Sequence, residues 1–282
     1  MDYKRQLFSY LYYPLRFSNS FFFRKYPRLR VLIYHDIPQD KEDLFSSQIS
    51  WLTKSWKFIS PEEFCSIIDG RSHLKEDSLL LTFDDGFLSN RRIAERILNP
   101  LSIKAIFFVV SNFVNIKNKE LCANFISENI YPDLEPRFVP RDWKNMDLLD
   151  LSFLIRTGHT IGAHSLSHAK LSSLNNNDLY KEINFGTDYL EEKLCIKIEH
   201  FAYPFGNLSS VNQNALIAVK ERFRYIYTGF RGDNSKSNSW AIRRDAVEPD
   251  DPKYLIGAFL EGGADAIYKK NINLYHRWNK EK

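Results

Sequence analysis

Cysteine is scarce in this chain of 282 residues, which has only Cys65, Cys122 and Cys195. Their number is odd, they are widely spaced, and no CxxC pair occurs. The sequence therefore predicts neither a disulfide framework nor a thiolate zinc site. A reducing compartment fits this cysteine usage best.

Long hydrophobic runs are also lacking. The longest uncharged piece near the amino terminus, Gln6 to Leu15, has ten residues, whereas a helix that spans a bilayer needs about 20. This piece contains Pro14 and lacks a small-residue cleavage site, so a secretory signal is not predicted either. We therefore expect a cytoplasmic protein, with a peripheral position at the inner face of the membrane as the alternative.

Acidic residues are nearly missing from the first 30 positions, where Asp2 stands against seven basic residues. The local balance of +6 leaves −2 for the remainder of a chain whose net charge is +4. Ten aromatic residues share this stretch, and mixed basic and aromatic residues suit a membrane interface. Residues 1–28 are thus expected either to pack on the surface of the domain or to contact a membrane. We expect no basic groove in the rest of the chain and find no nucleic-acid motif there, so no nucleic-acid partner is predicted.

The remaining sequence, residues 29–282, has no internal repeat and is predicted to form a single domain. Short apolar segments alternate with helix-like segments, which is typical of βα units around a parallel sheet. The expected strands are 30–35, 79–84, 105–110, 159–164, 200–203, 225–229 and 240–244. The expected helices are 44–54, 61–68, 88–98, 148–156, 177–194 and 210–222. Ser60 and Pro61 mark the start of the second helix by an N-cap and a proline at the first position. The predicted fold is α/β, a distorted or incomplete (β/α) barrel of about seven parallel strands, with an insertion at about 115–145.

Two adjacent carboxylates, Asp84 and Asp85, end the apolar run 79–83 and precede Gly86. An apolar run closed by a turn signal indicates a buried strand, and α/β enzymes usually place their chemistry at the carboxyl ends of strands. Neighbouring carboxylates repel each other unless a cation or a shared proton holds them. A metal site is therefore a natural hypothesis.

Two histidines, His164 and His168, follow another expected strand. Their spacing lets both rings converge on one ion, although a single histidine is more often an ordinary surface or core residue. A third segment, Phe201–Gly206, places Pro204 and Gly206 where a strand must turn. An N–H exposed there could stabilise an oxyanion, and the alternative is a plain turn.

Taken together, these segments resemble the polysaccharide deacetylases of the NodB-homology type, carbohydrate esterase family 4. Residues 82–86 match the first family motif, 164–168 the second, and 203–206 much of the third, within a similarity that runs from about residue 29 to 250. The resemblance implies that Asp85, His164 and His168 bind one divalent metal, and that Asp84 is the general base. It also implies that the Phe205 backbone N–H stabilises the oxyanion, with Tyr203 and Pro204 beside the substrate.

Two departures from the family pattern concern the support of the catalytic groups. Ala202 stands where the third motif usually begins with arginine, and no Leu-His-Asp sequence occurs near the carboxyl terminus. Tyr34 and His35 resemble the opening of a permuted branch that includes the poly-N-acetylglucosamine deacetylases, which implies that His35 is the general acid. For the missing arginine we select Arg244 to orient Asp84, with Arg243 as the alternative. Only one of the two is expected to face the site, because adjacent strand residues point to opposite faces.

The function that we expect is removal of an N-acyl group, foremost acetyl, from an amino sugar. The substrate would be a carbohydrate with an N-acetylated amino sugar, in a surface polysaccharide or its lipid-linked or nucleotide-linked precursor. Zinc is the expected metal, with cobalt, nickel and iron as alternatives. Three other functions remain open: N-deformylation of a lipid-linked amino sugar, a non-haem iron oxygenase with the same ligand set, and an inactive glycan-binding homologue. Asp245 and Glu248 are expected either to contact the sugar or to be loop acids.

Overall fold

The computed structural model describes residues 26–279. Most of the basic and aromatic segment, residues 1–25, lies outside the described residues, so the membrane-contact and packing hypotheses stay predictions. None of the helices in the described part of the chain has both the length and the apolar character needed to cross a bilayer.

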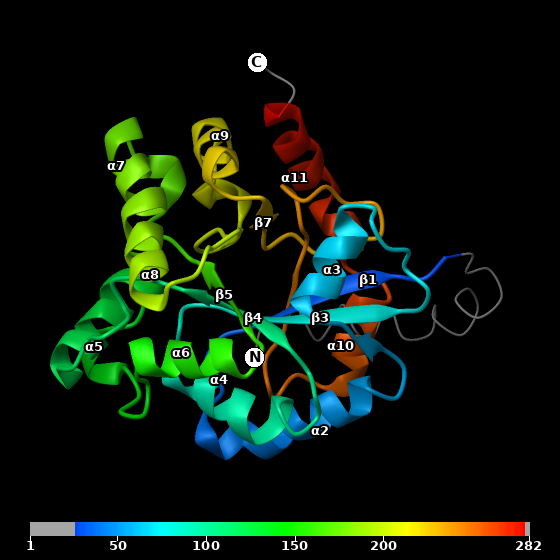
Figure 1. Cartoon of the computed structure of the whole chain (residues 1–282), viewed down its shortest axis with the longest axis horizontal. Helices are drawn as coiled ribbons and strands as arrows, with labels where there is room; N and C mark the ends of the chain where they lie inside the picture. The colour runs from blue at the N-terminus through cyan, green and yellow to red at the C-terminus, as the bar shows by residue number, and fades with distance from the viewer. Residues whose placement is uncertain (1–25, 280–282) are drawn as a thin grey trace.

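A curved parallel sheet forms the centre of the molecule (Figure 1). Its order is β7-β6-β5-β4-β3-β1-β8, and β2 pairs with β3 beside this path. The strands are β1 (Leu29–Tyr34), β2 (Lys57–Phe58), β3 (Ser78–Phe83), β4 (Ala105–Val109), β5 (Thr160–Ala163), β6 (His200–Ala202), β7 (Tyr225–Tyr227) and β8 (Asp245–Ala246). The predicted fold, a distorted or incomplete (β/α) barrel, is confirmed.

Helices surround the sheet (Figure 1). They are α2 (Glu42–Leu52), α3 (Pro61–Ile68), α4 (Leu88–Ile93), α5 (Lys119–Phe125), α6 (Leu148–Arg156), α7 (Asn176–Tyr180), α8 (Gly186–Leu194), α9 (Gln213–Arg222), α10 (Lys253–Leu260) and α11 (Asp265–Trp278). Three wider helical turns continue α4, α5 and α7, namely η2 (Ala94–Leu98), η3 (Ile126–Ile130) and η6 (Lys181–Phe185). Helix α3 begins as predicted, because the Ser60 side chain accepts a hydrogen bond from the Glu63 N–H. Helices α5, α10 and α11 were not predicted.

The strand expected at 240–244 is wrong in its position. Only Ile242 forms a bridge there, to Tyr227, and the strand itself is β8, which pairs with Leu32 and Ile33 of β1. The physical reason lies in the Asn234 side chain, which accepts a hydrogen bond from the Arg243 N–H and donates one to the Arg243 carbonyl. These bonds use the backbone groups that a neighbouring strand would need. Residues 240–246 therefore connect β7 to β1 through two short pairings, Ile242 with Tyr227 and β8 with β1.

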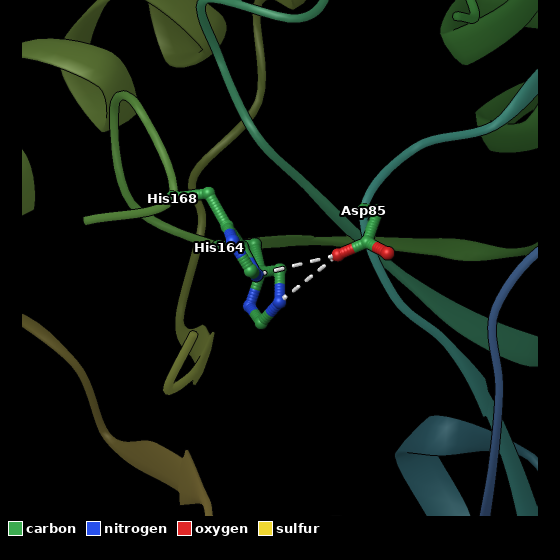
Figure 2. A group of neighbouring side chains, drawn as sticks. All are labelled: Asp85, His164 and His168. Carbon is green, nitrogen blue, oxygen red and sulfur yellow. Dashed lines mark ion pairs between the residues drawn. The ribbon is translucent and has the colours of Figure 1, made fainter. Parts of the chain in front are cut away.

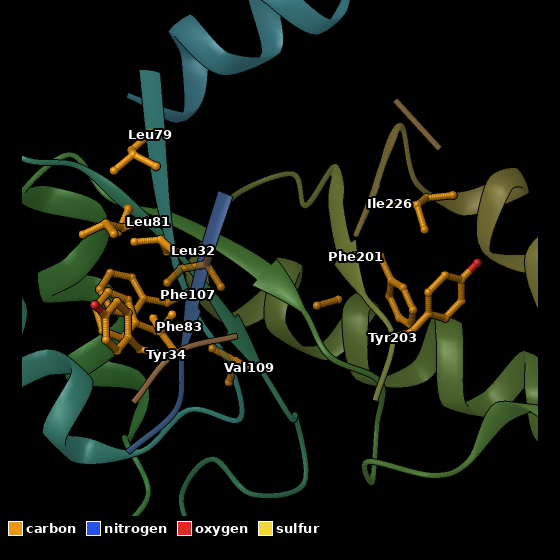
Figure 3. Close-up of a cluster of buried hydrophobic side chains, with 14 of the residues drawn as sticks. Leu32, Tyr34, Leu79, Leu81, Phe83, Phe107, Val109, Phe201, Tyr203 and Ile226 are labelled. Carbon is orange, nitrogen blue, oxygen red and sulfur yellow. The ribbon is translucent and has the colours of Figure 1, made fainter. Parts of the chain in front are cut away.

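Side chains alternate between the two faces of the sheet. The outer face packs against the helices in a large apolar cluster that includes Leu79, Leu81 and Phe83 of β3 (Figure 3). The inner face holds a second cluster with Leu80 of β3 and Ile242, and Phe64 and Cys65 of α3 pack with it. The same period of two places His35, Asp84 and His164 on the inner side, directly after β1, β3 and β5. Arg244, which directly precedes β8, faces the same cavity.

Asp245 is not positioned to contact a sugar, which corrects one of the two expectations for this residue. Its side chain is fully buried and forms a two-pronged ion pair with the buried Arg30. Arg30 also bonds to Asp265 at the start of α11, so the cluster joins β1 and β8 to that helix. The role of Asp245 is therefore structural.

The buried His200 should make the protein sensitive to acid. Burial lowers the pKa of His200 from 6.5 to about 3, so the folded protein keeps this imidazole neutral while the unfolded chain protonates it. Above pH ~6.5 this pKa difference does not change the free energy of unfolding, because the imidazole is neutral in both states. Below pH ~6.5 the free energy of unfolding should fall by about 1.4 kcal/mol per pH unit, until the pH reaches the pKa of His200 in the folded protein. We expect His200→Gln to reduce the pH dependence of the free energy of unfolding by about 1.4 kcal/mol per pH unit. The free energy is measured by urea unfolding at several pH values between 6.5 and 4. The exposed His73→Gln is the control, and equal slopes in both variants would contradict the prediction.

Candidate active site

A cavity of about 670 Å³ opens at the carboxyl ends of the strands. His35, Asp84, Asp85, His164, His168 and Arg244 all line it. These residues directly follow β1, β3 and β5, directly precede β8, or lie in the loop after β5, so the fold brings together side chains that are up to 209 positions apart. Such convergence of polar groups in one cavity is typical of an enzyme site.

Asp85, His164 and His168 form a group that could hold a metal ion (Figure 2). One ligand atom of each lies within 4.8 Å of the others, and the Asp85 Oδ1 is 3.5 Å from the Nε2 of each histidine. Asp85 and His168 both have a positive φ, 75° and 64°. This backbone conformation turns Asp85 out of the strand alternation, so that it faces the same cavity as Asp84.

Hydrogen bonds set the orientation of both imidazoles. The His164 Nδ1 is 2.8 Å from the Ala202 carbonyl, and the His168 Nδ1 is 2.8 Å from the Asn129 carbonyl. A carbonyl can only accept, so each Nδ1 donates, and the Nε2 that faces Asp85 is the nitrogen that can bind a metal when the ring is neutral. This arrangement is usual for histidines that bind metals. The three residues therefore fit a divalent metal by donor type and by tautomer.

The surroundings of the two histidines shift their pKa values in opposite directions. Burial lowers the pKa of His168 to about 4, so this ring is neutral near pH 7. Burial also acts on His164, but the neighbouring Asp84 and Asp85 outweigh it and raise the pKa of that ring. Burial would raise the pKa of Asp85, but hydrogen bonding to His164 and the positive form that His168 takes at low pH outweigh it and lower the pKa to about 2. Asp85 is therefore ionised and able to bind a cation.

Asp84 has a different partner. Both of its carboxylate oxygens accept hydrogen bonds from the Arg244 guanidinium, at 2.7 and 2.9 Å, and both side chains are buried. Burial would raise the pKa of Asp84, but the charge of Arg244 outweighs it and lowers the pKa. Arg244 is in turn fixed by a hydrogen bond to the Thr228 carbonyl. The pair holds Asp84 ionised and in one orientation beside the metal group.

Arg243 points away from the cavity, and its guanidinium donates to the Asp233 carbonyl. Ala202 lies in the inner apolar cluster, and its carbonyl orients His164. The position where the third motif usually carries arginine thus contributes a backbone acceptor here. The guanidinium beside Asp84 comes from Arg244, which lies 160 positions further along the chain.

His35 lines the cavity, and its positive form lowers the pKa of both Asp84 and Asp85. The Asn90 side chain donates a hydrogen bond to the His35 carbonyl and so fixes the backbone at this point. The imidazole is therefore within electrostatic reach of both carboxylates.

The turn after β6 agrees with some of the positions predicted for its residues and disagrees with others. Phe205 has a φ of 61°, and its ring lies 4.6 Å from the His168 ring. No residue between 26 and 279 accepts a hydrogen bond from the Phe205 N–H. Tyr203 touches the cavity, but its hydroxyl bonds to Tyr275 in the core, and Pro204 does not line the cavity. The expected substrate contact through Tyr203 therefore does not use its hydroxyl, and Pro204 is not positioned for one.

Part of the cavity wall comes from residues that the sequence did not identify. Ile130, Tyr131, Pro132, Asp133, Leu134 and Trp143 line the cavity, and all belong to the predicted insertion at 115–145. The three prolines of this segment indicated a loop, but no periodic pattern indicated which side chains face the site. Glu248, which was expected near the sugar or in a loop, does not line the cavity.

Glu182 of η6 holds the loop that carries the two histidines. Its carboxylate accepts hydrogen bonds from both the N–H and the hydroxyl of Ser167, and its carbonyl accepts one from the Leu166 N–H. The side chain is buried, and no cation pairs with it in the described residues. The positive φ values of Ser165 and His168 show that this loop is tightly bent. Glu182 is therefore a positioning residue for His168.

We expect Glu182→Gln to weaken metal binding by on the order of tenfold, as is common for residues that orient metal ligands. The amide replaces one acceptor oxygen by an NH2 group that faces the Ser167 donors. The affinity is measured by titration with Zn²⁺ against a competing chelator. Asp178→Asn, an exposed carboxylate on α7, is the control with the same change in charge. Equal affinities of the two variants would show that Glu182 does not position the loop.

Comparisons with known proteins agree with this geometry. Residues 71–223, more than half of the chain, match the family model for polysaccharide deacetylases. YxkH of Bacillus subtilis (strain 168), whose name assigns it provisionally to the polysaccharide deacetylases, is 20% identical over 241 residues, 83% of this chain and 76% of YxkH.

Two solved structures share the fold. The deacetylase PplD of Streptococcus pyogenes, in complex with acetate, has a TM-score of 0.65 at 18% identity over 83% of this chain and 98% of PplD. IcaB from Ammonifex degensii has a TM-score of 0.64 at 22% identity over 86% of this chain and 98% of IcaB. At these identities the likeness concerns the fold.

Proposed function

Because the chain belongs to the polysaccharide deacetylase family, whose members are hydrolases of amide bonds, we propose that it removes an N-acetyl group from an amino sugar. The substrate is a surface polysaccharide or a lipid-linked or nucleotide-linked precursor of one. One observation supports this function above the others. Two adjacent carboxylates have separate partners, since Asp85 faces two imidazoles while Asp84 is held by Arg244.

In this proposal Asp85, His164 and His168 hold one divalent metal ion, and the donor set suits zinc first. When bound, such an ion polarises the acyl carbonyl and lowers the pKa of water from ~15.7 to about 7. The cavity that these three residues line has a volume of about 670 Å³, which leaves room for the substrate.

Asp84 is the general base in this proposal. It accepts a proton from the attacking water, and the buried Arg244 keeps it ionised and aimed at the reaction centre. The unpaired Phe205 N–H donates to the developing oxyanion. His35 donates a proton to the amine nitrogen as the carbon–nitrogen bond breaks, because imidazole can carry a proton near neutral pH.

The alternatives differ in how well they use these residues. An iron oxygenase would leave the Asp84–Arg244 pair without a role, and the family consists of hydrolases. An inactive homologue has no need for a buried cluster of carboxylates and imidazoles, which is costly to keep. An N-deformylase uses the same chemistry, so it is the second candidate.

The test is acid release from N-acetylated and N-formylated amino-sugar oligomers under anaerobic conditions with Zn²⁺. We expect acetate and one free amine for each bond cleaved. Formate release alone would support the deformylase, and turnover that needs oxygen would support the oxygenase. No release of either acid from any substrate would contradict the proposal.

We also propose that residues 1–28 hold the enzyme at a membrane, on the basis of their basic and aromatic composition. The full chain should sediment with vesicles that contain anionic lipid, and a chain that lacks residues 1–25 should not. Equal partitioning of the two would contradict this proposal.

A further inference from the structure

A second cavity, of about 680 Å³, lies beside the first and is rich in positive charge. Its lining includes all five basic residues of the segment 115–145, namely Lys117, Lys119, Arg137, Arg141 and Lys144. The same segment has five acidic residues, but only Glu120 lines this cavity. The charges of a neutral segment are thus separated in space, with the cations gathered around one hollow.

Most of these cations have no counter-charge of their own. Lys117, Lys119, Arg141 and Lys144 are exposed, and none forms an ion pair with a residue in the described part of the chain. Arg137 pairs with the exposed Glu135. Like charges around a hollow repel one another and attract an anion, because their fields add within it.

The backbone ties this cavity to the candidate active site. The Leu88 N–H donates to the Lys144 carbonyl at 2.7 Å, and the Met146 N–H donates to the Gly86 carbonyl at 2.9 Å. The rim of the second cavity is therefore bonded to the loop that directly follows Asp84 and Asp85. Trp143 lines both cavities, so the two share part of a wall.

We infer that the second cavity binds a phosphate or diphosphate group carried by the substrate, while the N-acyl sugar occupies the first cavity. This inference rests on the proposed function and selects among its substrates. An uncharged polysaccharide offers nothing for five cations, whereas lipid-linked and nucleotide-linked sugars both carry phosphate. Arginine adds a planar fork that matches two phosphate oxygens at once.

The experiment reverses the charge of two basic residues that line the second cavity, in the full chain. This cavity variant carries Arg141→Glu and Lys144→Glu. The matched control is Lys54→Glu with Lys75→Glu, which makes the same change in net charge. Lys54 and Lys75 are exposed and lie in the connections that lead into β2 and β3, at the other end of the strands. Neither variant alters a residue of the metal group, so both keep the first cavity intact.

Binding of pyrophosphate, UDP and citronellyl diphosphate is measured by calorimetry at low salt with Zn²⁺ present. We expect the cavity variant to bind at least tenfold more weakly than the control, and binding to weaken as salt is added. Preference for citronellyl diphosphate or for UDP identifies a lipid or a nucleotide as the carrier. Unchanged binding in the cavity variant would place the phosphate on the metal and would overturn the inference.

Turnover distinguishes the failure of this inference from the failure of the proposed function. The wild type and both variants are assayed with a neutral N-acetylglucosamine oligomer and with N-acetylglucosamine linked to UDP or to citronellyl diphosphate. We expect the KM for the phosphate-linked substrates to rise tenfold or more in the cavity variant and not in the control. The KM for the neutral oligomer should not rise in either variant, and this pattern supports the inference. Equal kinetics of the two variants on all substrates would overturn it and leave the deacetylase intact. Pyrophosphate binding that is lost in the cavity variant, together with no acid release by the wild type, would overturn only the proposed function.

Discussion

Asp84→Asn should abolish acetate release and leave the metal bound. The amide keeps the size of the side chain but cannot accept the proton of the attacking water. Loss of a general base costs typically ~10²–10⁴-fold in rate. Metal binding should persist because the ligands are Asp85, His164 and His168. The measurements are kcat from acetate release and zinc content from elemental analysis of the same sample.

The Asp84→Asn variant also leaves the buried Arg244 without its counter-charge. Removing one member of a buried pair typically destabilises a protein by about 3–5 kcal/mol. Melting curves must therefore show that the variant is folded at the assay temperature. Asp133→Asn, an exposed carboxylate that lines the same cavity, is the control and should keep its activity. Acetate release by Asp84→Asn at the wild-type rate would remove Asp84 as the base.

Asp85→Asn should have the second large effect, which is loss of both metal and activity. Asparagine tolerates a positive φ better than most residues, so the turn at 75° should survive while the anionic ligand is lost. Changes to residues that only orient a ligand cost about 10–100-fold in metal affinity, so loss of a ligand should cost at least ~100-fold. Zinc titration measures the affinity, and Asp133→Asn again serves as the control.

Thermal melting gives a readout that does not depend on turnover. At 100 times the dissociation constant, a ligand stabilises the folded state by about 2.7 kcal/mol. Zinc should therefore raise the melting temperature of the wild type by several degrees and leave that of Asp85→Asn unchanged. An equal rise in both proteins would show that zinc binds elsewhere.

Local patterns in the sequence were sufficient to predict β1 and β3 to β7, and to place much of the site at their ends. The apolar run 79–83 predicted β3, and the residues after it lie at the cavity because parallel strands end at one edge of the sheet. The period of two predicted that only one of Arg243 and Arg244 would face inward, and Arg244 does. These inferences succeed because alternation and strand polarity are properties of the chain over a few residues.

Other features depended on contacts between distant segments. Helices α10 and α11 were missed, and α11 is held through Asp265 by the buried Arg30, which lies 235 positions earlier. The segment 240–244 does not form a strand because the Asn234 side chain occupies its backbone. In the first case a distant side chain supports the helix, and in the second a side chain nine positions earlier takes the backbone groups that a strand would use.

Asp84 and Asp85 also combine a feature that the local sequence determines with one that depends on the whole fold. The sequence alone was enough to predict that Asp84 and Asp85 follow a buried strand, because residue type and period decide that locally. The family resemblance and the choice of Arg244 supplied their expected partners, but only the folded chain shows how these are reached: Arg244 reaches Asp84 from 160 positions away, and the positive φ of Asp85 turns it towards the histidines. Ion pairs and backbone turns of this kind are set by the packing of the whole barrel, which no short window of sequence contains.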